Sequence, residues 1–209
     1  MKPRIGVLAM QGDFQEHATL LRRLEVENCE VRAPDQLAAC DGLIIPGGES
    51  TTIARLLLAF DLMDPLRRRI EDGMPVWGTC AGAILIANDV PGLDRTPIGA
   101  MDIRVQRNAF GRQLDSFEAD LHVDGIDGGP LHAVFIRAPV ITAVGPEVAV
   151  IASLDDGRIV ACRQGPLLAT SFHPELTDDP RLHELFVSVV CAATERPLAT
   201  PSAESESTA

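Results

Sequence analysis

The residue whose type and surroundings point most directly to catalysis is Cys80, in the turn Gly78-Thr79-Cys80-Ala81-Gly82. Apolar residues 74–77 before the turn predict a buried strand, and the apolar residues after it predict a helix. A strand–turn–helix of this kind holds a nucleophile off the end of a sheet, and the helix dipole favours the reactive thiolate. Free cysteines are more often small core residues, so the turn alone leaves both interpretations open.

A cysteine nucleophile needs a base, and His173 is the best placed histidine because it directly follows an apolar strand predicted at 167–172. Pro174 favours an extended backbone, in which Glu175 would project on the same side as His173. A carboxylate there can orient the imidazole and stabilise its cation. Taken alone, His-Pro-Glu is equally well a solvated turn. Together with the cysteine turn it favours a triad of Cys80, His173 and Glu175.

The other four histidines are expected to be surface or structural residues. His17 and His183 fall within predicted helices, and His122 and His132 lie near predicted turns. None directly follows a predicted strand in the way that His173 does.

An acyl-transfer site also needs donors for a developing oxyanion. The N–H of Ala81, next to the cysteine, is the usual first donor. Gly47-Gly48 lies between a predicted strand and a predicted helix, so its amides are candidates for the second. The pair is also explained as a tight turn with Ser50 or Thr51 as the helix N-cap, and the two interpretations are compatible.

The elements that position these residues alternate between strands and helices in the first half of the chain. Asp13 is the expected N-cap of the first helix. Strands are predicted at 4–10, 29–33 and 42–46, and helices at 14–27, from 49 through 60, and at 65–72. This alternation indicates βαβ units and a mostly parallel sheet, with sites at the carboxyl ends of the strands.

After Pro91 short strands predominate, separated by Gly, Pro and Asp turns. They are predicted at 98–105, 116–122, 133–136, 148–153 and 158–163, followed by the strand at 167–172 and a helix at 179–193 with Pro180 in its first turn. The expected fold is α/β with three layers, a mostly parallel central sheet, helices on both faces and an antiparallel extension. One domain is expected over 1–196, with a disordered Ser/Thr-rich acidic tail at 197–209.

Composition limits the class of function. The formal net charge is -12 and no block of Lys or Arg occurs, so neither nucleic acid nor an anionic membrane is an expected partner. No apolar run approaches the roughly 20 residues of a membrane span. The five cysteines are an odd number without a C-x-x-C pair, which argues against a disulfide framework or a metal site and fits a reducing cytoplasm.

Several segments together resemble the class I, triad-type, glutamine amidotransferases, whose fold is flavodoxin-like. They are IGVLAMQGDFQEH, LIIPGGESTT, PVWGTCAGAILIA, VQRNAFGRQLDSFEADL, VFIRAP and SFHPELTDD. Of these, GGEST, RNAFGRQ and FIRAP resemble more specifically the glutaminase subunits of pyridoxal 5′-phosphate synthase. The segments extend over almost the whole chain before the tail.

The resemblance implies that Cys80 attacks the side-chain amide of L-glutamine, releases ammonia and forms a γ-glutamyl thioester that water hydrolyses. It implies that His173 is the acid and base and that Glu175 orients it. The implied oxyanion hole is Gly47, Gly48 and Ala81, with a glycine-pair peptide that must reorient when the partner binds. The implied glutamine-binding residues are Gly48, Glu49, Ser50, Arg107, Ile136 and Arg137.

The implied partner is the lyase subunit that builds the pyridoxal ring and receives the ammonia. Gln11 and Gly12 are the implied contacts with that subunit, and this chain needs no cofactor of its own. The side-chain chemistry agrees with the implied substrate, because arginines such as Arg107 and Arg137 bind a carboxylate and Glu49 can neutralise an ammonium. Read alone, each arginine is more simply a surface charge.

Three alternatives stay open. The chain could be the glutaminase subunit of another amidotransferase. It could be a γ-glutamyl hydrolase or a peptidase-like cysteine hydrolase, which would not need the 47–52 and Arg107 segments in this form. A non-catalytic regulatory protein of the same fold is disfavoured because Cys80, His173 and Glu175 are all present.

Overall fold

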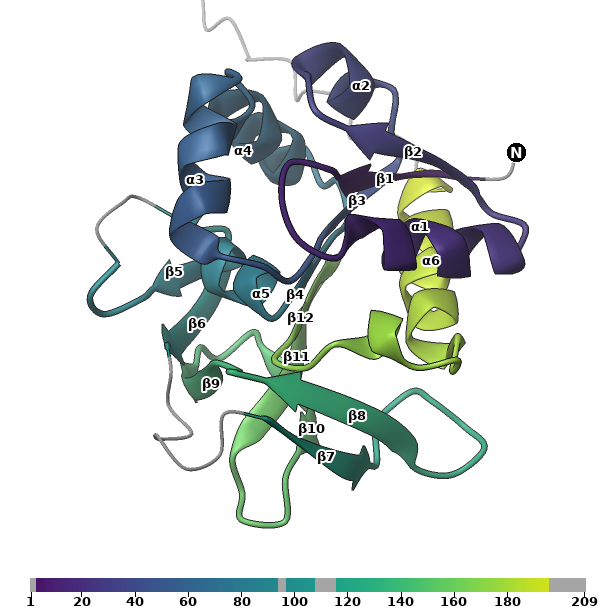
Figure 1. Cartoon of the computed structure of the whole chain (residues 1–209), viewed down its shortest axis with the longest axis vertical. Coiled ribbons are helices and arrows are strands. Elements are labelled where there is room, and N and C mark those ends of the chain that lie inside the picture. The colour runs from purple at the N-terminus through teal and green to yellow at the C-terminus, as the bar shows by residue number, and fades with distance from the viewer. Residues whose placement is uncertain (1–2, 94–96, 108–115, 196–209) are drawn as a thin grey trace, which may run out of the picture.

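The computed structural model describes residues 3–93, 97–107 and 116–195. Within them a ten-stranded sheet has the order β2-β1-β3-β4-β12-β11-β9-β6-β5, with β10 paired to β11 (Figure 1). Five of these strands are parallel neighbours. They are β1 (Arg4–Leu8), β2 (Glu27–Val31), β3 (Gly42–Ile45), β4 (Val76–Thr79) and β12 (Leu167–Thr170).

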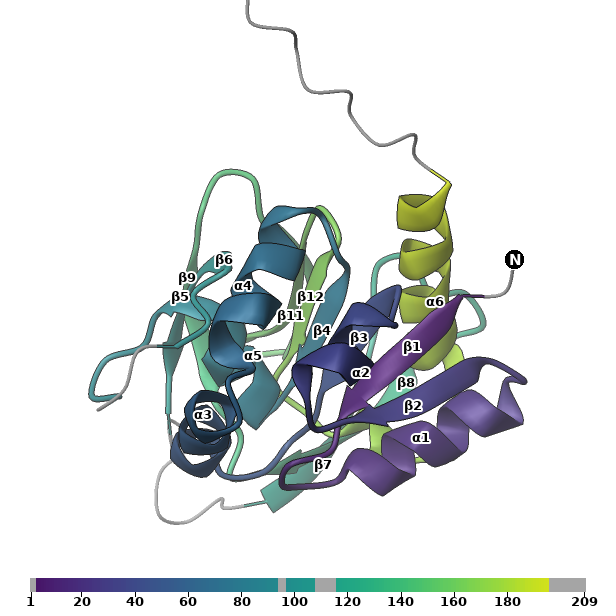
Figure 2. The ribbon, with the colours of Figure 1, turned by 90° about the horizontal axis from the view of Figure 1, so that it is seen from above.

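Helices cover both faces of the parallel strands. For this reason every residue of β3, β4 and β12 is buried. One face carries α1 (Phe14–Arg23) and α6 (Arg181–Thr194). The other carries α2 (Pro34–Ala38), α3 (Ser50–Ala59), α4 (Met63–Glu71) and α5 (Ala81–Ile86). Figure 2 shows these two groups on opposite sides of the sheet. The predicted three-layer α/β arrangement is confirmed.

Side chains alternate between two cores along the central strands. Ile44 and Trp77 pack with the α1 and α6 face, whereas Leu43, Ile45 and Val76 pack with the α3 and α5 face. Successive strand residues point to opposite faces, so a continuous apolar strand supplies both cores. Both cores therefore fix the strand ends from which the site is built.

An antiparallel extension continues the sheet beyond β12, as predicted. It contains β6 (Met101–Gln106), β9 (Val140–Val144), β10 (Ala149–Ser153) and β11 (Ile159–Gln164), with β5 (Ala87–Asp89) parallel to β6 at the edge. The strands β7 (Ser116–Leu121) and β8 (Leu131–Ile136) form a separate antiparallel pair. That pair packs on the core of α1 and α6.

Several boundaries differ from the sequence prediction. The first helix ends at Arg23, because Glu25 takes a positive φ of 55° and the next strand begins at Glu27. The strand before the cysteine runs to Thr79, two residues beyond its predicted end. The elements α2, β5 and β9 were not predicted. The predicted tail at 197–209 and Asn108–Gln113 of the RNAFGRQ segment lie outside the described residues.

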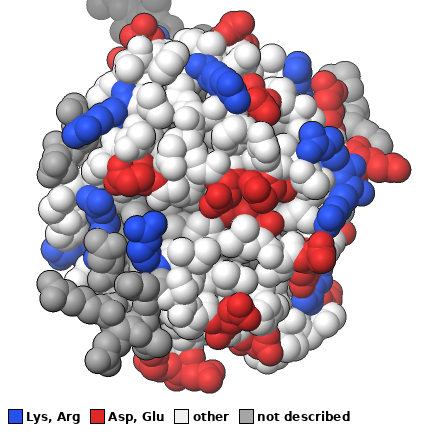
Figure 3. All heavy atoms as spheres, in the orientation of Figure 1, with Lys and Arg blue, Asp and Glu red and all other residues white. Residues whose placement is uncertain are grey.

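In the described part of the chain, none of the helices combines the length and apolar character that crossing a membrane requires. On the face shown in Figure 3, acidic and basic side chains are interspersed among uncharged ones. The carboxyl ends of β1, β3, β4 and β12 all lie at one edge of the sheet, since these strands are parallel. Each of these ends leads into a segment that carries predicted site residues.

Candidate active site

Cys80 occupies the sharp turn between β4 and α5. Its dihedral angles are φ 48° and ψ -102°, which a residue with a side chain adopts rarely. The turn is held in place because Cys80 N donates to Thr170 O of β12 at 2.8 Å. A side chain on Gly78 would collide with the backbone of Gly82, and a side chain on Gly82 would collide with the carbonyl oxygen of Ile45, so both positions require glycine. The predicted strand–turn–helix is therefore present.

The Cys80 side chain is largely buried but lies next to the end of β8. Its exposed fraction is 7%, and Sγ lies 4.0 Å from the carbonyl oxygen of Ile136. Ile136 is 36% exposed, and the next residue, Arg137, takes a positive φ of 44°. The VFIRAP segment thus approaches the cysteine, as its predicted role at a substrate site requires.

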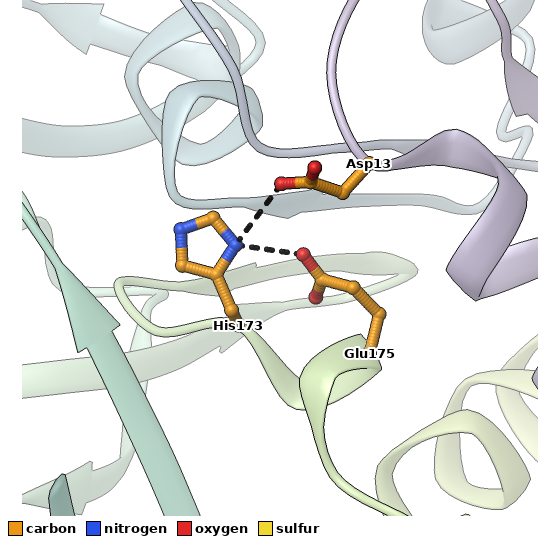
Figure 4. Close-up of side chains that lie close together, drawn as sticks. All are labelled: Asp13, His173 and Glu175. Carbon is orange, nitrogen blue, oxygen red and sulfur yellow. Dashed lines mark hydrogen bonds and ion pairs between the residues drawn. The ribbon is translucent and has the colours of Figure 1, made fainter.

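His173 and Glu175 form a buried hydrogen-bonded pair. The ring Nδ1 of His173 lies 2.7 Å from Glu175 Oε1, and the two residues are 4% and 5% exposed (Figure 4). The predicted extended backbone is wrong for Glu175, because Pro174–Leu176 forms a short 3-10 helix. This turn, and not an extended segment, brings the carboxylate back beneath the imidazole.

The environment of His173 favours the imidazolium ion. Burial acts to lower its pKa, but hydrogen bonds and charge interactions with Cys80 and Glu175 outweigh burial and raise the pKa to about 10. Burial raises the pKa of Glu175, and the contact with His173 opposes that shift. Since Nδ1 is engaged by Glu175, the other ring nitrogen, Nε2, is the one available to the sulfur.

Asp13 is a second carboxylate beside the same ring nitrogen. Its Oδ2 lies 3.7 Å from His173 Nδ1, and Figure 4 shows it above Glu175, with both carboxylates converging on that nitrogen. Asp13 stands at the N-cap position of α1, as predicted, but its side chain makes no capping hydrogen bond. Sequence reasoning missed its place at the site. The available signal was its position directly after the loop that follows β1.

Asp13, His173 and Glu175 are also a group of described residues whose ligand atoms lie within 4.8 Å of one another, close enough to hold a metal ion. The short hydrogen bond between His173 and Glu175 already engages the ring nitrogen that such an ion would use. The arrangement is thus better suited to proton transfer than to coordination.

The glycine pair lies against the catalytic candidates. A Cβ on Gly47 would come 2.9 Å from His173 Nδ1, and Gly48 has a φ of 147°. Gln11 and Gly12 pack on this pair from the loop after β1: Glu49 N donates to Gln11 Oε1 at 2.7 Å, and a side chain on Gly12 would collide with Gly47 O. The close approach explains why glycine is required at 12 and 47. Ala81 is buried as the first residue of α5.

Glu49 is the N-cap of α3, which corrects the prediction of Ser50 or Thr51. Its carboxylate accepts from Thr51 N at 3.1 Å and from Thr52 N at 2.7 Å. Burial acts to raise its pKa, but the hydrogen bonds from Thr51 and Thr52 outweigh burial and lower the pKa to about 2. Ser50 itself is buried at the start of the helix.

Arg107 lies beside Glu49, with Nη2 3.7 Å from Oε1. It also lines a hollow of about 620 Å³ together with Arg104, Gln106 and Thr142. The segments expected to bind glutamine thus meet in two places, at Glu49 with Arg107 and at Ile136 with Cys80.

His17 and His183 were predicted to be surface or structural residues. They are not surface residues, since both are fully buried. His17 Nε2 lies 3.3 Å from Glu175 Oε2, and the two histidines lie 2.9 Å apart through Nδ1 of His17 and Nε2 of His183. His132 is exposed between Glu118 and Asp120 on the β7–β8 pair, and His122 is exposed too. Asp13 and His17 are four positions apart, and this i, i+4 spacing was the signal that both lie on the same side of α1 and face the site.

Comparison with known proteins gives consistent matches over nearly the whole chain. A model of the SNO glutamine amidotransferase family matches residues 7–192. The pyridoxal 5′-phosphate synthase subunit PdxT of Herpetosiphon aurantiacus is 57% identical over 188 residues, which are 88% of this chain and 99% of the relative. The protein of the same name from a Parafrankia species is 58% identical over 192 residues, covering 90% and 93%.

Solved structures agree with these matches. A crystal structure of a glutamine amidotransferase superposes with a TM-score of 0.85 at 49% identity, over 90% of this chain and 98% of that one. The structure of PurLQS from Thermotoga maritima has a TM-score of 0.64 at 18% identity, covering 92% and 97%. The second likeness concerns the fold alone.

Proposed function

Because the chain belongs to the SNO glutamine amidotransferase family, we propose that it hydrolyses L-glutamine to L-glutamate and ammonia as the glutaminase subunit of a pyridoxal 5′-phosphate synthase. The resemblance inferred from the sequence is confirmed at the level of the family. The observation that carries the activity is the buried His173–Glu175 hydrogen bond at 2.7 Å beside the Cys80 turn. The name of the curated relatives supports the choice of synthase.

The proposed reaction uses Cys80 as nucleophile and His173 as acid and base. The thiolate adds to the side-chain amide carbon of glutamine, and His173 Nε2 donates its proton to the departing nitrogen, which leaves as ammonia. Water then attacks the γ-glutamyl thioester and gives a proton to Nε2. Collapse of the resulting tetrahedral intermediate releases glutamate and restores the thiolate. Glu175 keeps the ring oriented through Nδ1 throughout.

The oxyanion of both tetrahedral intermediates would be stabilised by backbone N–H groups of Ala81 and of the Gly47-Gly48 pair. The Gln11–Gly12 loop packs directly on that pair. A partner that docks on this loop would therefore move the peptide between the two glycines. This supports Gln11 and Gly12 as contacts with a lyase subunit whose binding completes the oxyanion hole.

For substrate binding we assign Arg107 and Arg137 to the α-carboxylate and Glu49 to the α-ammonium. Ionised Glu49 beside Arg107 supports this assignment. Gly48, Ser50 and Ile136 complete the proposed glutamine site, and the Ile136 carbonyl 4.0 Å from the sulfur supports its position at the reacting end.

The ammonia is proposed to pass to the lyase subunit, so this chain would bind no cofactor itself. We propose the cytoplasm as its compartment, which its five free cysteines support.

The test is to measure ammonia release from glutamine with and without the lyase subunit. We expect weak hydrolysis by the chain alone and strong stimulation by the lyase. Equal turnover in both conditions would contradict the partner-dependent oxyanion hole. Preference for γ-glutamyl peptides over glutamine would favour a γ-glutamyl hydrolase, and stimulation only by another synthase would favour a different amidotransferase.

A further inference from the structure

Two buried histidines continue the chain of polar contacts behind Glu175. His17 and His183 are both 0% exposed, and His17 bridges Glu175 Oε2 at 3.3 Å and His183 Nε2 at 2.9 Å. The ring of Trp77 packs edge-on against both, with centroids 5.7 Å and 4.9 Å away. A continuous polar path thus runs from the site through α1 to α6.

The second oxygen of Glu175 needs a hydrogen-bond donor. Glu175 Oε2 is buried and, among the described residues, accepts no hydrogen bond of good geometry. Figure 4 shows that Oε1, and not this oxygen, makes the contact with the His173 ring. A buried carboxylate oxygen without a donor is costly. His17 Nε2 lies within reach, and such bonds are often long in unliganded enzymes and shorten during the reaction.

The hydrogen-bond partners of the two rings determine their tautomers. If His17 carried its proton on Nδ1, its Nε2 lone pair would face the carboxylate, and His183 would be left with a buried Nδ1–H that has no acceptor among the described residues. With the protons on the Nε2 atoms, His183 donates to His17 Nδ1, and His17 Nε2–H is hydrogen-bonded to Thr79 Oγ1 at 3.4 Å while Glu175 Oε2 lies 3.3 Å from the same nitrogen. Only an Nδ1 lone pair of His183 is then left unused, which is the lesser cost.

We propose that His17 is a positioning residue, whose Nε2–H donates to Glu175 Oε2 and holds that carboxylate ionised and turned toward His173. The proposal rests on the proposed glutamine hydrolysis. His17 acts as a neutral donor, because burial, with His183 and His173 nearby, keeps its pKa well below the ordinary value. The ionisable groups that face Glu175 are His173 after β12, His17 on α1 and Asp13 in the loop before α1.

Loss of this donor should weaken the cysteine–histidine pair. Without it, Glu175 takes up a proton more readily and stabilises the His173 imidazolium less, so a smaller fraction of Cys80 is thiolate at a given pH. The effect should appear in the reactivity of Cys80 even without glutamine.

The experiment compares His17→Leu, which removes the donor, with His17→Gln, whose amide N–H replaces it. His183→Leu is the matched control: it removes an equally buried ring that does not touch Glu175, and His17 should keep its proton on Nε2 because the carboxylate still lies next to that nitrogen. The rate of Cys80 alkylation by iodoacetamide is followed against pH by peptide mass spectrometry, which separates Cys80 from the half-buried Cys29 and Cys191. Glutamine hydrolysis with the lyase subunit is measured in parallel, and thermal melting reports folding.

We expect His17→Leu to move the half-maximal pH of alkylation upward by about one unit, a tenfold slower reaction on the acid limb. His17→Gln should restore most of the rate, and His183→Leu should leave the half-maximal pH nearly unchanged while lowering the melting temperature. An unchanged profile in folded His17→Leu, or an equal shift in His183→Leu, would overturn the proposal.

If the leucine variants do not fold, ¹⁵N NMR of the histidine rings in the unmodified chain decides. Neutral His17 with its proton on Nε2 is expected near neutral pH, and a proton on Nδ1 would overturn the proposal. If the unmodified chain with the lyase fails to hydrolyse glutamine, the proposed function fails, but alkylation and NMR still test His17.

Discussion

Gly47 lies against the imidazole of His173 so closely that a Cβ on the glycine would come 2.9 Å from Nδ1. The glycine follows β3 and the histidine follows β12, so two separate strand ends meet in one contact. The proposed oxyanion donors and the proposed base therefore lie side by side, with no room for a side chain between them.

Substitution of Gly47 by alanine should disable the site while leaving the fold in place. The added methyl group displaces the His173 ring, and a displacement of about 1 Å can reduce turnover by ~100-fold. The assay is ammonia release in the presence of the lyase subunit, with circular dichroism to verify folding. Gly73→Ala is the control for backbone strain without a clash at the site: its φ of 93° disfavours alanine, but a Cβ there would meet no atom within 4 Å and the residue lies outside the site. Comparable activity of Gly47→Ala and Gly73→Ala would show that the close packing of Gly47 on His173 does not matter for turnover.

Asp13→Asn should lower kcat/KM for glutamine hydrolysis slightly. A carboxylate 3.7 Å from Nδ1 stabilises the His173 imidazolium, but Asp13 has a 45% exposed side chain and water screens it. The expected loss is at most about fivefold in kcat/KM, with less dependence on salt concentration than in the parent. Glu16→Gln, an exposed carboxylate on the same helix, is the control. A 100-fold loss in Asp13→Asn would instead place Asp13 in direct contact with the reaction.

Stability should fall in mild acid because of the buried histidines. Burial lowers the pKa of His183 to about 3, and it also lowers that of His17. The unfolded chain takes up protons near the ordinary histidine pKa, so this contribution to stability is present above about pH 6.5 and is lost as the pH falls toward 3. Urea unfolding across this range measures the slope.

His183→Phe removes one of these groups and should flatten the pH dependence of the unfolding free energy. An equally steep decline in that variant would show that other groups cause it.

The cysteine turn could be predicted because its signal is local: glycines on both sides of Cys80 follow a short apolar strand. The partnership of His173 and Glu175 was predicted correctly, but for an incorrect backbone. Proline at 174 starts a 3-10 helix here, which returns Glu175 to the ring. Spacing alone does not distinguish the two conformations.

Other features depend on contacts between distant segments. Glu49 displaces Ser50 as the cap of α3, because its longer side chain reaches both Thr51 N and Thr52 N. Asp13 and His17 reach the site only because β1 and β12 end at the same edge of the sheet. The strand β9 is apolar at four of its five positions and could have been predicted, whereas α2 has only five residues, too few for a periodic pattern.

The most direct test of the central claim is to trap the acyl intermediate on the cysteine. The chain is mixed with its lyase partner and glutamine, quenched in acid within the first turnover, and digested for mass spectrometry. We predict a γ-glutamyl group on the peptide that contains Cys80, and neither adduct nor ammonia from Cys80→Ala. Continued ammonia release by folded Cys80→Ala, or an adduct on another cysteine alone, would contradict the account.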